Sequence, residues 1–89
     1  MTVQEVNDYA ESCDKTILMF SNPDFAGAII GISSDDRVIY DYDKMIQDLM
    51  QTEDLSEVDA IEFINYNTIR SLPYYDNAPI ILQIKNYYK

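Results

Sequence analysis

The residues best suited to chemistry are three aspartates in one short stretch of the sequence. Asp41 and Asp43 alternate in an apparently extended segment, and Asp48 follows nearby. Alternating carboxylates point to one side of a strand, and carboxylate oxygens are preferred ligands of Mg²⁺ and Ca²⁺. The plainer interpretation, which we favour, makes Asp43 a helix N-cap and Asp41 a solvent-facing strand residue. We therefore expect no metal site and no cofactor.

Other catalytic residue types are scarce. The sequence contains no histidine, which removes the commonest general base and imidazole metal ligation. Its single cysteine, Cys13, falls on the apolar side of an expected helix over residues 3–13, far from the helix N-terminus that would lower its pKa. We expect an inert core thiol there. The sequence therefore predicts a protein without catalytic residues that is not an enzyme.

Acidic residues dominate the middle of the chain. The net charge is −10, and residues 41–62 hold eight acids and one base. Helices in this region would display carboxylates at intervals comparable to duplex phosphates, so the face could compete for a basic nucleic-acid channel. Alternatively, the charge only keeps a small protein soluble. The candidate partner-binding residues of this acidic face are Asp48, Glu53, Asp54, Glu57, Asp59 and Glu62.

Eight tyrosines form the second unusual feature of the composition. Tyrosine is enriched at interface centres because it buries a large area while keeping a polar tip, although several of these rings could equally pack along strands. A self-association surface and a partner-binding surface would look identical in the sequence. The candidate aromatic binding residues are Phe63, Tyr66, Tyr74 and Tyr75, and a dimer could also bury Tyr87 and Tyr88.

The charge balance also indicates the kind of partner. An acidic chain repels nucleic-acid phosphates and anionic membranes, so we expect a protein partner with a basic surface and no direct binding to either. The alternative is a homodimer or a larger homo-oligomer. The N-terminus lacks the features of a signal peptide and no apolar run is long enough to span a membrane, which leads us to expect a cytoplasmic protein.

The elements that must position these residues form one domain over residues 1–89. Helices are expected over 3–13 behind a Thr2–Glu5 capping box, over 44–52, and from Ser56 to Leu72. The last of these should break near Tyr66, or else bury and bond Asn65, Thr68 and Ser71, the polar residues on its apolar side. Strands are expected over 16–20, 28–33, 38–42 and 79–84, and a glycine in the second indicates a bulge or a close backbone approach. The order α-β-β-β-α-α-β predicts an α+β fold whose four-stranded, largely antiparallel sheet carries helices on one face.

The same patterns predict strand positions and a core. Residues 16–20 and 79–84 are almost continuously apolar and should lie inside the sheet, with the more polar 38–42 toward an edge. The first helix and the Ser56 helix should cover one face. The expected core residues are Val6, Ala10, Val58, Ile61 and Ile64, packed against Leu18, Ile30 and Leu82.

Two stretches carry a resemblance, DRVIYDYDKMIQDLM over residues 36–50 and SEVDAIEFINYNTIRSLPYYDNAPIIL over residues 56–82. With the preceding strand pair, they resemble a group of small acidic proteins of unassigned function from Firmicutes and their phages and mobile elements. Asn65 stands where that pattern has Asp, and residues 75–77 replace a glycine-containing loop. The resemblance transfers no catalytic or binding residue. It implies a bacterial or phage-borne accessory protein, a setting that includes anti-CRISPR inhibitors.

Overall fold

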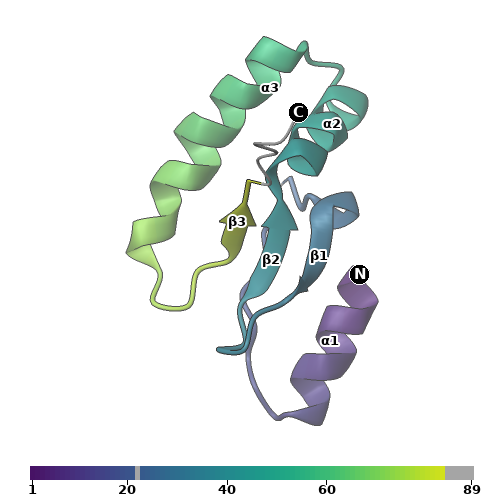
Figure 1. The fold of residues 1–89 in the computed structure, drawn as a ribbon, viewed down its shortest axis with the longest axis vertical. Coiled ribbons are helices and arrows are strands. Elements are labelled where there is room, and N and C mark those ends of the chain that lie inside the picture. Colours follow the sequence, from purple (N-terminus) through teal and green to yellow (C-terminus); the bar gives the residue numbers. More distant parts are fainter. Residues whose placement is uncertain (22, 84–89) are drawn as a thin grey trace, which may run out of the picture.

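The computed structural model describes residues 1–21 and 23–83 and has an α+β fold (Figure 1). This part of the chain forms helices and one three-stranded sheet. In chain order the elements are α1 (Val3–Ser12), η1 (Ala26–Ala28), β1 (Ile29–Ile32), β2 (Val38–Asp41), α2 (Tyr42–Thr52), α3 (Glu57–Phe63), η2 (Ile64–Thr68), η3 (Ile69–Tyr74) and β3 (Ile80–Leu82). Segments η1 and η3 are 3₁₀-helical, and η2 is a π-helical turn.

Strand β2 lies in the centre of the sheet, between β1 and β3. It pairs antiparallel with β1, where the register shifts between Ile29 and Gly31, next to the glycine that predicted a bulge. It pairs parallel with β3, because the crossover through α2 and α3 returns the chain to the same end of the sheet. The prediction of an edge position for residues 38–42 is therefore wrong, since Val38 and Tyr40 are fully buried. Strand β3 lies at an edge of the sheet that the described residues form, so the predicted interior position of residues 79–84 is wrong for this part of the chain. Ile84 lies outside the described residues.

Residues 16–20 form no strand, so the predicted four-stranded sheet with three consecutive strands is wrong for the described residues. Side chains fix this segment instead. The Phe20 ring lies 4.7 Å from the Tyr40 ring, and the Phe20 backbone N–H donates to the Tyr40 hydroxyl at 3.2 Å. Because side chains stand perpendicular to a sheet, these contacts hold the segment over one face of β2 rather than beside an edge. Figure 1 draws it behind the sheet.

Helix caps follow the sequence closely. Thr2 and Glu5 form the predicted capping box of α1, and the Ser56 hydroxyl accepts from the Asp59 N–H at the start of α3. Helix α2 begins two residues earlier than expected, at Tyr42, because Asp41 rather than Asp43 is its N-cap and accepts from the Lys44 N–H at 3.1 Å. The prediction that an aspartate caps this helix is correct, but the capping residue is Asp41 and not Asp43.

The expected break near Tyr66 does not occur. The chain remains helical from Glu57 to Tyr74 but widens into the π turn η2 and then tightens into η3. An α-helix has about 3.6 residues per turn, so side chains four residues apart point in slightly different directions around the helix axis. A wider turn offsets this difference and keeps Ala60, Ile64 and Thr68 buried together. The alternative of buried and bonded polar side chains is correct in part. Thr68 is buried, and Ser71 is half-buried and donates to the Thr68 carbonyl, whereas Asn65 is exposed and accepts from the Tyr42 hydroxyl.

The core contains residues from the helices and the sheet. Val6, Ala60 and Ile64 belong to one buried cluster, together with Tyr40 and Phe25. Val6 and Ile64 confirm the predicted core, and Ala10, Leu18 and Ile61 are half-buried. The helix α3 is rotated relative to the prediction, which leaves Val58 65% exposed. The expected core positions that lie at the surface instead are Val58, Ile30 and Leu82.

Candidate partner-binding surface

The three aspartates that could bind a metal do not assemble. The Asp41 carboxylate caps α2, Asp43 is exposed, and Asp48 is half-buried farther along the helix. Burial raises the pKa of the Asp48 carboxyl, with a smaller contribution from the negative charge of Asp24. Among residues 1–21 and 23–83, no group of three or more Asp, Glu or Cys side chains lies where it could hold a metal ion.

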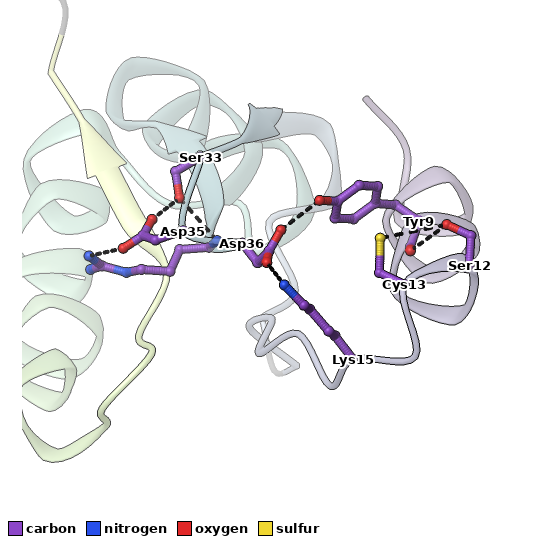
Figure 2. Close-up of polar contacts among 8 residues, drawn as sticks. Tyr9, Ser12, Cys13, Lys15, Ser33, Asp35 and Asp36 are labelled. Atoms are coloured by element: carbon purple, nitrogen blue, oxygen red, sulfur yellow. Dashed lines mark hydrogen bonds and ion pairs between the residues drawn. The ribbon is translucent and has the colours of Figure 1, made fainter.

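Cys13 is exposed, so the prediction of a core thiol is wrong. Helix α1 ends at Ser12, and Cys13 is its C-cap, before the chain turns through Asp14 at a φ of 53°. The thiol sulfur lies 3.8 Å from the Ser12 hydroxyl oxygen (Figure 2). The apolar spacing that suggested burial continued one residue beyond the helix.

A polar cluster that the sequence analysis missed joins α1 to the turn between β1 and β2 (Figure 2). The Tyr9 hydroxyl donates to the Asp36 Oδ1 at 2.6 Å, and the Lys15 ammonium forms an ion pair with Oδ2 of the same carboxylate. The hydrogen bond to Asp36, aided by Cys13, raises the pKa of Tyr9 to about 12. Lys15 and then Tyr9 lower the pKa of Asp36. These contacts connect α1 and the residues after it to the turn between β1 and β2, so we assign the cluster a structural role.

The acidic residues predicted to bind a partner are divided between two environments. Asp48 turns toward η1, since its Oδ1 is 3.8 Å from where a Cβ on Gly27 would stand. The remaining predicted acids are exposed on the loop that follows α2 and on α3: Glu53, Asp54, Glu57, Asp59 and Glu62. Asp54 also has a backbone role, because it adopts a φ of 54° after the end of α2.

Four candidate residues from the two predicted sets meet at one place. Asp59, Glu62, Phe63 and Tyr66 line an open hollow of about 350 Å³, completed by Leu55 and Asn67. We call this hollow the acidic–aromatic groove. Phe63 is half-buried against the core, and Tyr66 is 70% exposed. The groove thus combines a fixed aromatic ring, a free aromatic ring and two carboxylates along one side of α3 and η2.

The Tyr66 ring already binds a cation of the same chain. The guanidinium carbon of Arg70 lies 4.9 Å from the ring centroid, within the range of a cation–π contact. Residues 66 and 70 are four apart, so they are neighbours along the helical surface. The exposed face of this ring therefore accepts a guanidinium group.

The other predicted aromatic residues lie away from the groove. Tyr74 is 86% exposed at the end of η3, and Tyr75 is 53% exposed. Tyr75 lines a second, larger cavity of about 400 Å³, and Phe63 and Asn67 line both this cavity and the groove. Tyr87 and Tyr88 lie outside the described residues.

Comparisons with other proteins add no family to this description: no protein-family model, curated protein or solved structure matches the chain. None of the helices in the described part of the chain has the length and apolar character needed to cross a bilayer.

Proposed function

We propose that this protein is a non-enzymatic interaction protein that binds a basic surface of a partner protein through the acidic–aromatic groove. The observation that supports this proposal is the meeting of Asp59 and Glu62 with Phe63 and Tyr66 around one hollow. Carboxylates give charge complementarity to Lys and Arg, and an exposed tyrosine ring adds a cation–π surface. The exposed acids Glu53, Asp54 and Glu57 extend the negative field along the neighbouring surface.

The most concrete form of this proposal is an inhibitor that occupies the nucleic-acid channel of a bacterial or phage protein, as an anti-CRISPR protein would. The setting follows from the resemblance to small acidic proteins of Firmicutes and their phages, and it includes a cytoplasmic location. The chemistry follows from the charge: a net −10 chain attracts the Lys- and Arg-rich surfaces that otherwise bind phosphates. The expected site contains no catalytic residue and no cofactor.

The proposal is tested by titrating the protein with a fluorescent arginine–glycine repeat peptide at several salt concentrations. Binding to carboxylates is screened as ionic strength rises, so the affinity should fall steadily with added salt. An uncharged serine–glycine peptide of the same length is the control and should not bind. Affinity for the arginine peptide that is independent of salt would contradict a charge-based partner surface.

A second candidate function is self-association, because exposed aromatic residues continue beyond the groove. Tyr74 and Tyr75 lie side by side in sequence at the end of η3, and β3 ends with the exposed Leu82. A homo-oligomeric accessory protein would bury these residues between copies. Light scattering over a range of concentrations distinguishes the two functions. A stable dimer that Tyr74→Ser and Tyr75→Ser dissociate would favour self-association, and a monomer would favour the basic partner.

A further inference from the structure

The cavity of about 400 Å³ lies between two segments that are distant in sequence. One wall is formed by residues 18–21 with Phe25, and the other by Phe63 and Thr68 with Ser71 and Leu72 of η3. Its volume is within the usual range for small-molecule sites in proteins. Phe25 and Thr68 are buried, so the cavity reaches the core.

Three parts of the lining adopt a conformation that their local sequence does not favour. Residues 18–20 have strand-type sequence but no strand partner among the described residues. Phe25 is a bulky, fully buried residue with a φ of 49°. Thr68 closes the π turn η2, a rare conformation in an otherwise regular helical stretch. Bulky residues at positive φ and π turns are both concentrated at functional sites, and their convergence here singles out this cavity.

The residues that line the cavity disfavour a charged ligand. The chain has sixteen acidic and six basic residues, yet none of the described residues that line the cavity is acidic or basic. A charged ligand would lose its hydration there without gaining an ion pair, whereas an uncharged apolar body would gain contacts with Phe20, Phe25 and Phe63.

Two polar side chains of the lining donate hydrogen bonds to the backbone. The Ser71 hydroxyl donates to the Thr68 carbonyl at 2.7 Å, and the Asn67 amide nitrogen donates to the Phe63 carbonyl at 3.2 Å. Their oxygens keep acceptor capacity, because a hydroxyl oxygen and an amide oxygen each have two lone pairs. These two oxygens can therefore accept from a hydrogen-bond donor on a ligand.

We propose that this cavity is a binding site for an uncharged molecule with an aromatic or branched aliphatic body and one hydroxyl or N–H donor. This site is distinct from the acidic–aromatic groove, although the two share Phe63 and Asn67, and it does not depend on the proposed basic partner. The lining provides a binding site rather than a catalytic one, since its described residues offer no acid, base or metal ligand.

Indole is the probe of choice, because it is uncharged and carries one N–H donor on an aromatic body. Titration of the ¹⁵N-labelled full chain with indole should give saturable chemical-shift changes at residues of both walls, with a Kd of about 1 mM for so small a ligand. Indole-3-acetate, which adds a carboxylate to the same ring, should bind at least about tenfold more weakly. Equal affinity for the two probes, or no saturable shifts with indole, would overturn the proposal.

A filling variant provides the second arm of the experiment. Ser71→Phe places a ring in the half-buried lining and should weaken indole binding by about tenfold or more. The matched control, Gln47→Phe, adds the same ring at an exposed position of α2 outside the lining and should leave indole affinity unchanged. Indole binding that survives in a folded Ser71→Phe protein would place the probe elsewhere. The comparison of the two probes on the unmodified chain does not depend on either variant folding.

Discussion

Arg70 stacks on Tyr66, with its guanidinium carbon 4.9 Å from the centre of the ring. The ring is otherwise largely exposed and lines the acidic–aromatic groove beside Glu62. A cation of the chain itself therefore occupies part of the surface that we propose for a cation of the partner. Arg70 therefore competes with a partner's cation for the Tyr66 ring. The competition is weak, because an exposed cation–π contact contributes only about 0.5–1 kcal/mol.

Replacing Arg70 should strengthen the binding of a cationic partner. Arg70→Gln removes the competing guanidinium and frees the Tyr66 ring, so affinity for the arginine–glycine peptide should rise about twofold to fivefold. Lys44→Gln is the control, because it removes one positive charge from an exposed position of α2 outside the groove. Equal gains in the two variants, measured by fluorescence anisotropy, would attribute the effect to net charge rather than to the ring.

The burial pattern of the central helical stretch predicts where stability resides. Ile64 is fully buried, and Ile64→Ala should cost about 2–5 kcal/mol in the free energy of unfolding. Val58 lies one to two turns earlier and is mostly exposed, so Val58→Ala should change that free energy by less than about 0.5 kcal/mol. Urea denaturation followed by circular dichroism measures both. A larger loss for Val58→Ala would mean that α3 faces the other way.

The polar cluster at Asp36 predicts loss of stability at both extremes of pH. The pKa of Asp36 is lowered by Lys15 and Tyr9, so its contribution is present above its ordinary pKa of 3.8 and is lost as pH falls below that value. The pKa of Tyr9 is raised to about 12, so its contribution is present below its ordinary 10.0 and is lost as pH rises toward 12.

Asp36→Asn tests this cluster, since asparagine tolerates the φ of 62° at this position. The variant should lose less stability than the unmodified chain over both pH windows, and the pKa of Tyr9 should fall toward 10. Asp14→Asn, at a φ of 53°, is the matched control and should keep both losses. Thermal unfolding from acid to alkaline pH measures the losses, and tyrosinate absorbance reports the pKa. Identical pH profiles of stability for the two variants would show that Asp36 does not cause the losses at acid and alkaline pH.

Asp54 should limit stability through its backbone rather than its charge. It adopts a φ of 54° directly after α2, where glycine is favoured, so Asp54→Gly should stabilise the fold by about 0.5–1 kcal/mol. Asp54→Ala removes the same charge but keeps a Cβ, and it should not stabilise. If urea denaturation shows equal gains for the two variants, repulsion from Glu53 and Glu57 is the cause instead.

Local signals in the sequence predicted much of the fold. The capping box of Thr2 and Glu5, the Ser56 cap and the bulge beside Gly31 were all correct, because each depends on residues within a few positions of one another. The α+β class followed from the order of such signals. The failure at residues 16–20 has a different origin: the contact of Phe20 with Tyr40, which is distant in sequence, together with a contact to Phe25, overrides the strand propensity.

The candidate site was predictable in composition but not in arrangement. Asp59, Glu62, Phe63 and Tyr66 lie within eight residues, so a helix was bound to bring some of them together. Asp48 turned away because α2 packs against η1, a contact no local pattern encodes. The only sign of the π turn in the sequence was that three polar residues, Asn65, Thr68 and Ser71, fall on the apolar face of the expected helix. That pattern suggested a break, whereas the helix widened instead.

The groove should matter more to binding than the total charge of the chain does. A double variant, Asp59→Asn with Glu62→Gln, removes two charges from the groove. Glu11→Gln with Asp14→Asn removes two charges from exposed positions around the end of α1. The two proteins have equal net charge, so any difference between them reports position alone.

The affinity of these two charge-matched proteins for the arginine–glycine peptide, measured side by side at one salt concentration, tests the central claim most directly. We expect the groove variant to bind about tenfold more weakly than the unmodified chain, as the loss of two ion pairs at the upper end of their usual strength implies, and the control to bind within about threefold of it. Equal weakening in both variants would show that the peptide responds to overall charge, and it would contradict a partner-binding site at the acidic–aromatic groove.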